Sequence, residues 1–195
     1  MTKIVNQRIA DYPVADIFLE RWSPRSFKEQ EIPEDLLMSV FEAARWAPSA
    51  RNRQPWYFIL ATTKEEREVF HQFIFEGNLQ WAKKAPVLAL LLSRKTAEDG
   101  EENRYHTFDA GCAWGYLALQ ATKNGLITRA IGGFDKEKAR ELLDIPSEYE
   151  CHLVIPIGYP GEKGELPEEL QEKERPTERR PIKESIFKGK FGRPL

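Results

Sequence analysis

The stretch DAGCAWGYLALQATK, residues 109–123, decides the fold that this sequence predicts. Its residues are apolar or small on nearly every side of a helix, so we expect a central helix rather than a surface one. Gly111 and Gly115 each cost about 1 kcal/mol of helix propensity. Close approach of another backbone to this helix would offset that cost. The pair Asn124-Gly125 supplies a natural helix stop.

Extended and helical patterns lie on both sides of this helix. Residues 86–93 and 152–159 form nearly continuous apolar runs, which indicate fully buried strands, and shorter strands are expected over 56–60 and 126–134. Further helices are expected over 14–20, from Pro33 to residue 47, over 64–81 with Gly77 as a point of weakness, and over 135–143 with Asp135 as N-cap. Helices and strands do not alternate strictly, which favours an α+β fold over a doubly wound one.

The composition is typical of one soluble domain that spans residues 1–195. A net charge of -2 argues against a general nucleic-acid binder. The chain has no run of about 18 apolar residues and no signal-peptide core, so we expect a cytoplasmic protein without a membrane partner. Two separated cysteines and three scattered histidines predict free thiols and no metal site.

The composition changes sharply beyond Gly161, where Glu, Lys, Pro and Arg dominate as far as Pro181. Such a segment cannot bury a core by itself. It ends in apolar residues that are suited to docking: Ile182, Ile186, Phe187 and Phe191. We therefore expect residues 161–195 to form an extended C-terminal arm.

The segment RWSPRSF, residues 21–27, places two arginines and two hydroxyl groups within six residues. Guanidinium groups match phosphate oxygens in pairs, and charged hydrogen bonds are stronger than neutral ones. A phosphate site is one interpretation. On spacing alone, an exposed basic turn is an equally good one.

The segment APSARNRQPW, residues 47–56, joins a predicted helix to a predicted strand. Ser49 offers a hydroxyl group, and the amides of Asn52 and Gln54 can each donate and accept, as a uracil-like edge requires. A polar loop held between two prolines explains the same residues and is slightly favoured when the segment is taken alone. Arg51 and Arg53 make the loop unusually basic.

Two weaker signals follow later in the chain. Gly132-Gly133 comes after a predicted strand, where the absence of a Cβ lets the backbone approach a ligand, although a simple turn needs the same residues. The run RPTERRP, residues 175–181, could return a cation to a phosphate site, although charge runs are usually solvated.

Together and in this order, the four segments resemble the FMN-dependent nitroreductase family, from about Asp16 to Ile186. The resemblance implies a nitroreductase-like α+β fold with a central mixed or antiparallel sheet surrounded by helices. It also implies a homodimer whose C-terminal arms are exchanged and whose active sites are shared between subunits. The helix over 109–123 would then be the central dimer helix.

The resemblance also implies roles for individual residues. Positions of phosphate and isoalloxazine contact are matched by Arg21, Ser23 and Arg25, with Trp22 between them. The loop that reaches the FMN of the other subunit is matched by Pro48, Ser49, Ala50, Asn52 and Gln54, with Ala50 where a second serine is common. Asn78 matches a flavin-edge position, Ile131, Gly132 and Gly133 match the turn that faces flavin N5, and Arg179 or Arg180 matches a cation on the phosphate.

The implied activity is that of an FMN oxidoreductase. Hydride from NADH or NADPH would pass through flavin N5 to a nitroaromatic, a quinone or a similar small electrophilic acceptor. Because the flavin carries this chemistry, no catalytic side chain is expected. Two alternatives stay open: another reaction on the same fold, such as that of a dehalogenase or a dehydrogenase, and a flavin-binding protein without turnover.

Overall fold

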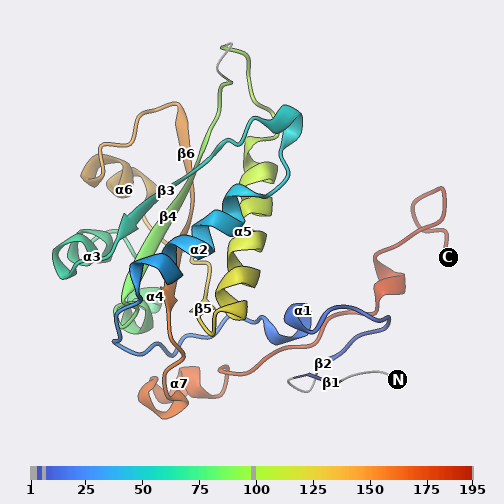
Figure 1. The fold of residues 1–195 in the computed structure, drawn as a ribbon, viewed down its shortest axis with the longest axis horizontal. Coiled ribbons are helices and arrows are strands. Elements are labelled where there is room, and N and C mark those ends of the chain that lie inside the picture. Colours follow the sequence, from blue (N-terminus) through green and yellow to red (C-terminus); the bar gives the residue numbers. More distant parts are fainter. Residues whose placement is uncertain (1–3, 6–7, 98–99, 195) are drawn as a thin grey trace.

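A computed structural model of the chain describes residues 4–5, 8–97 and 100–194. Its centre is a four-stranded antiparallel sheet in the order β3-β4-β6-β5 (Figure 1). The strands are β3 (Trp56–Ala61), β4 (Val87–Arg94), β6 (Tyr149–Gly158) and β5 (Ile127–Thr128), while β1 (Ile4–Val5) and β2 (Arg8–Ile9) form a separate pair. The α+β fold with an antiparallel sheet is therefore confirmed.

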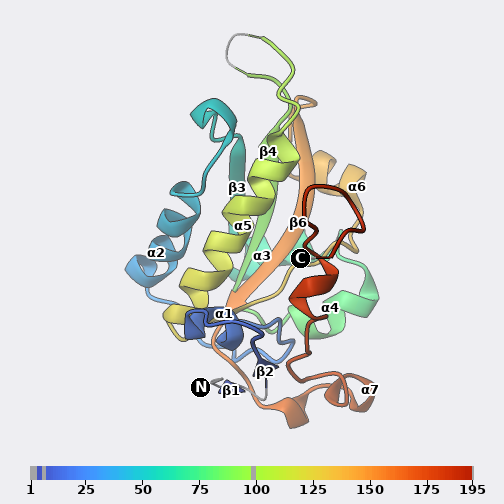
Figure 2. The same ribbon diagram turned by 90° about the vertical axis from the view of Figure 1, so that its right-hand side faces the viewer.

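Helices cover both faces of the sheet. One face carries α2 (Glu34–Arg45) and α5 (His106–Lys123), and the other carries α3 (Lys64–His71), α4 (Glu76–Ala82) and α6 (Lys136–Leu142). Figure 2 shows α2 and α6 on opposite sides of the strands. Each face of the sheet packs against its helices in a separate hydrophobic core. Alternate residues of β4 contribute to the two cores, Leu88 and Leu90 to one and Ala89 and Leu91 to the other. This two-sided burial explains why the strand is a continuous apolar run.

The predicted central helix is present as α5, which begins at His106, three residues before the predicted start. It ends as expected, with Asn124 as C-cap and Gly125 at a φ of +73°. A Cβ added at Gly111 or Gly115 would meet nothing within 4 Å. The close approach that these glycines predicted is therefore not made within the protomer.

Two predicted elements differ from the structure. The helix predicted over 64–81 is divided into α3 and α4, as the weak point near Gly77 allowed, but Gly77 itself lies inside α4. The break falls at residues 72–75, where Ile74 forms a β-bridge with Phe134 and Phe73 accepts a backbone hydrogen bond from Asp135 at 2.7 Å. The strand over 126–134 is likewise reduced to β5 and isolated bridges at residues 131 and 134.

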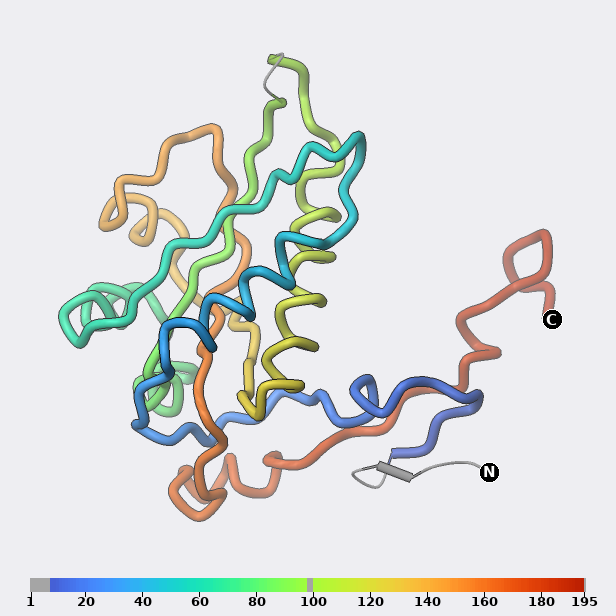
Figure 3. Tube along the Cα trace, viewed as in Figure 1, coloured from blue at the N-terminus to red at the C-terminus, as the bar shows by residue number. Residues whose placement is uncertain are grey.

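The segment predicted as an arm has two parts in the structure. Residues 161–174, which include α7 (Glu168–Gln171), lie against the same protomer, where Leu166 and Leu170 are buried in the core. The rest runs past α1 (Asp16–Glu20) and the N-terminal segment (Figure 3), and Ile182 donates its backbone N–H to the Asp11 carboxylate at 2.7 Å. None of the helices in the described part of the chain has the length and apolar character to span a bilayer.

Candidate functional site

The turn that follows α1 is held by two arginines that the sequence analysis did not single out. Arg8 donates from Nη1 to the carbonyl of Arg21 at 2.7 Å, and Arg129 donates to the carbonyl of Ser23. Arg8 is 7% exposed. In the sequence, Arg129 could have been singled out only as a charged residue that follows a short apolar strand. The turn is therefore surrounded by guanidinium groups from distant parts of the chain.

These cations disfavour one another's charge. Burial, followed by the charge of Arg179, lowers the pKa of Arg21. Burial lowers the pKa of Arg8, and the charges of Arg179 and Arg21 lower it further. Burial and then the charge of Arg25 lower the pKa of Arg129. A bound anion would relieve this repulsion, so the cluster has the electrostatic character of an anion site.

A hollow of about 650 Å³ opens between this turn and α5. One wall is formed by Phe18, Arg21, Ser23, Arg129 and Ala130, and the other by Cys112, Trp114, Gly115, Tyr116, Ala118 and Leu119 of α5. Cations thus lie beside an apolar and aromatic wall. This combination suits a ligand that carries both an anionic group and a flat apolar body.

The structure brings together two residues that the resemblance assigned separately to the flavin, Asn78 of α4 and Gly133. The Asn78 amide donates from Nδ2 to the Gly133 carbonyl at 3.3 Å, which the Phe75 backbone N–H also reaches at 3.3 Å. A Cβ at position 133 would lie 2.7 Å from Asn78 Nδ2. Ile131 pairs with Val154 of β6 through two backbone hydrogen bonds, which fix the start of this turn.

The predicted polar loop between α2 and β3 is strained. Arg51, Asn52 and Gln54 have φ values of 53°, 56° and 46°, in the left-handed region that costs roughly 1–2 kcal/mol per residue. Ser49 Oγ accepts the backbone N–H of Gln54 at 3.0 Å, and Gln54 Nε2 donates to the carbonyl of Asn52 at 3.1 Å. Strain of this kind is typical of functional loops.

This loop lies beside the start of α5, because Ala50 donates its N–H to the Asp109 carboxylate at 3.1 Å. The hollow at Arg21 lies beside the second half of the same helix, and Asp109 and Leu119 are about 15 Å apart along it. Figure 1 shows the loop and α1 at opposite ends of α5. The turn at Arg21 and the polar loop are therefore separate groups in one protomer, and Asn78 with Gly133 forms a third.

The remaining predicted residues are also placed. Trp22 is half-buried within the turn, and Pro48 is exposed where the polar loop begins. The charge of Arg179 acts on Arg21, whereas Arg180 donates from Nε to Ser185 Oγ at 2.9 Å. The structure thus distinguishes two arginines that the sequence left equivalent. Outside these groups, the described residues include no cluster of His, Cys, Asp or Glu that could hold a metal ion.

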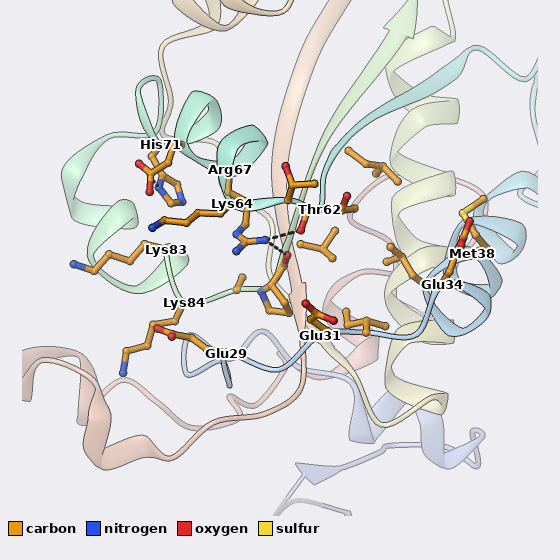
Figure 4. Close-up of a pocket in the computed structure, with 18 residues that line it drawn as sticks. Glu29, Glu31, Glu34, Met38, Thr62, Lys64, Arg67, His71, Lys83 and Lys84 are labelled. Carbon is orange, nitrogen blue, oxygen red and sulfur yellow. Dashed lines mark hydrogen bonds and ion pairs between the residues drawn. The ribbon is translucent and has the colours of Figure 1, made fainter.

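A larger hollow of about 1130 Å³ lies elsewhere, between the start of α2 and helices α3 and α4 (Figure 4). Its labelled residues include Lys64, Arg67, His71, Lys83 and Lys84, as well as Glu31 and Glu34, and Glu29 lies beside Lys84. Arg67 is already bonded to the carbonyls of Thr62 and Pro86 at 2.6 Å and 2.8 Å. The hollow contains none of the predicted site residues and mixes both signs of charge, so we place the functional site at Arg21.

The chain is therefore an α+β protein with a hollow that is lined by arginines and lies beside a long central helix. The sequence model of the Nitroreductase family matches residues 19–80 and 71–159. The chain therefore belongs to the nitroreductase family, as its motifs predicted.

Individual proteins show the same relationship. A solved structure described as an oxidoreductase containing FMN is 39% identical, with a TM-score of 0.94, and the match covers 99% of this chain and 100% of that one. An NADH dehydrogenase of Thermus thermophilus is 28% identical over 191 residues, which cover 80% of this chain and 92% of the relative. An iodotyrosine deiodinase of Thermotoga neapolitana is 28% identical over 169 residues, which cover 74% and 87% of the two chains.

Proposed function

We propose that this protein is a homodimeric FMN oxidoreductase that uses NADH or NADPH to reduce small electrophilic acceptors such as nitroaromatics or quinones. The observation that carries the proposal is the cluster of guanidinium groups around the Arg21–Ser26 turn, where burial and mutual repulsion disfavour their charge. Membership of the nitroreductase family and the similarity to an oxidoreductase containing FMN support it.

The residues present fit the cofactor. Arg21 and Ser23 would hold its phosphate, since their side chains add charge and a hydroxyl group to the same hollow, and Arg179 would assist them, since its charge acts on Arg21. Asn78 and the backbone of Gly133 would meet the edge of the ring, because an amide and a residue without Cβ stand together there. When bound, FMN supplies a ring that accepts hydride from a nicotinamide and returns it to an acceptor.

We infer the dimer from the separation between the turn at Arg21 and the polar loop in one protomer. A partner that packs along α5 could bring its own polar loop to the hollow of the first subunit. The described surface supports such packing, because Phe18, Phe108, Tyr116 and Phe191 are 53%, 72%, 44% and 93% exposed. Apolar exposure on this scale is typical of protein interfaces.

For the electron acceptor, one alternative is supported by a specific observation. Similarity to an iodotyrosine deiodinase favours dehalogenation as a second candidate reaction on the same cofactor. Steady-state oxidation of NADH and NADPH by the flavin-loaded protein, with nitrofurazone, menadione or a halogenated tyrosine, separates the candidates. We expect nitrofurazone or menadione to accelerate oxidation. Halide release only from the tyrosine would favour the deiodinase, and background oxidation with bound FMN would favour a protein without turnover.

A further inference from the structure

Glu174 places a buried carboxylate in the middle of the cation cluster. It lies just after α7, 149 residues beyond Arg25, and is 8% exposed. Its Oε1 accepts two consecutive backbone N–H groups, from Arg25 at 2.7 Å and from Ser26 at 3.0 Å. Its Oε2 lies 3.6 Å from Arg25 Nη1, and its charge also favours the charged form of Arg129.

Two adjacent N–H groups beside a guanidinium make a site for an anion, and here Glu174 fills it. Burying a carboxylate is costly unless it is paired and hydrogen-bonded. The two amides satisfy Oε1, whereas the buried Oε2 has no hydrogen-bond partner among the described residues and is paired only by the charge of Arg25. The amides of Arg25 and Ser26 are therefore not free to bind a phosphate. A cofactor phosphate at this turn would have to be bound by side chains rather than by these amides. Glu174 would fix the backbone that carries those side chains.

The same turn is joined to the arm at two further points. Gly161 donates its N–H to the Ser26 carbonyl at 2.8 Å, and Ser26 Oγ donates to the Glu162 carbonyl at 2.7 Å. A Cβ at Gly161 would lie 2.8 Å from the backbone of Phe27, so the two segments are in close contact. The turn therefore cannot take up its position unless residues 161–174 are packed against it.

We propose that Glu174 is a positioning residue of the cofactor-phosphate site, through which the seating of the arm and the binding of FMN are coupled. The inference rests on the proposed function, because it concerns the same cofactor. The carboxylate neutralises Arg25, fixes the turn and leaves Arg21 directed to the phosphate. By linkage, a ligand that needs the ordered turn must stabilise the seated arm by the same free energy.

The first test compares FMN and riboflavin, which differ by the phosphate. Glu174→Gln keeps the shape of the side chain but removes its charge, and Glu172→Gln changes an exposed carboxylate two residues away. Dissociation constants come from quenching of flavin fluorescence. We expect Glu174→Gln to weaken FMN binding by about tenfold or more and riboflavin binding by less than about threefold, with Glu172→Gln like the wild type. Equal weakening for both flavins, or no weakening for FMN, would overturn the proposal.

The second test needs no variant. Hydrogen exchange of residues 161–175 in the wild-type protein is measured with no flavin, with riboflavin and with FMN. We expect FMN to slow exchange in this segment clearly more than riboflavin does, and equal exchange in all three samples contradicts the coupling. A wild-type protein that binds no FMN at all refutes the proposed function, whereas FMN binding without the phosphate-dependent effects refutes only the role of Glu174.

Discussion

Asn78 and Gly133, which are 55 residues apart in the chain, are joined by a hydrogen bond of 3.3 Å between the Asn78 amide and the Gly133 carbonyl. The contact depends on the break between α3 and α4, because Ile74 and Phe75 bond to the segment that contains Gly133. The amide of Asn78 is thereby fixed over a backbone position that has no Cβ. The two residues form one element of the candidate ring site.

Gly133→Ala should separate stability from activity. The new Cβ would lie 2.7 Å from Asn78 Nδ2, and the end of a flexible side chain can move away at little cost. We expect a small change in melting temperature but a clear loss of kcat for NADH oxidation. Gly132→Ala is the matched control, since a Cβ there would meet nothing within 4 Å. Equal kcat in the two variants would remove Asn78 from the ring site.

Arg179 and Arg180 should differ in their effect on the cofactor. Arg179 donates from Nη1 to neighbouring groups of Thr177 and Glu178, and its charge acts on Arg21, whereas Arg180 donates to Ser185. We expect Arg179→Ala, like Arg21→Ala, to weaken FMN binding by roughly 1.5–3 kcal/mol, the usual value of a charged hydrogen bond. Arg180→Ala should cost clearly less. Isothermal titration with FMN measures both, and a larger loss in Arg180→Ala would reverse the assignment.

The half-buried His152 should make stability depend on pH. Ser93 Oγ lies 2.7 Å from His106 Nδ1 and 2.5 Å from His152 Nε2. Burial lowers the pKa of His152; among nearby charges Glu150 opposes this shift, and His106 and Lys136 add to it. His152 is therefore neutral in the folded protein at pH values where the unfolded chain already binds a proton.

The sign follows from proton uptake. Below about pH 6.5 the unfolded state binds more protons at this position, so the free energy of unfolding falls as the pH falls. Burial lowers the pKa of His71 as well, which adds to the effect. Urea denaturation between pH 7.5 and 5.5 should show decreasing stability, with a smaller slope in His152→Gln. A slope that the substitution leaves unchanged would assign the effect to other groups.

The dimer can be tested on the open side of α5. Gly115 has free space in the protomer, so Gly115→Leu should fold but should obstruct a partner that packs there. Sedimentation of the flavin-free protein should show a weakened dimer; FMN binding is not the readout, because Gly115 also lines the hollow at Arg21. Gly77→Leu, in another helix with free space, should leave the mass of the assembly unchanged. A dimer of full strength in Gly115→Leu would place the interface elsewhere.

The sequence could predict the fold where periodicity and burial agree. Residues 86–93 are apolar because β4 is buried on both faces, and Asp135 is indeed the N-cap of α6, accepting the N–H of Lys138. Gly77 indicated a weak point in the helix over 64–81, but the position of the break between α3 and α4 could not be predicted, because it depends on a bridge to Phe134 from a distant segment. Tertiary contact overrode local helical pattern there.

The candidate site could be predicted where a motif is local. The turn at Arg21 and the polar loop are both visible in consecutive residues. Arg8, Arg129 and Glu174 could not be found in this way, because each reaches the turn from a different part of the chain. Local pattern therefore indicated the candidate anion site, whereas the contact of Glu174 with the turn required the folded structure.

The most direct measurement is the absorption spectrum of the protein mixed with FMN, freed of unbound flavin, and then reduced with NADH or NADPH under nitrogen. The account predicts that a yellow flavin band stays with the protein and is bleached by one of these donors. Protein that emerges colourless, or bound flavin whose band neither donor bleaches, would contradict it.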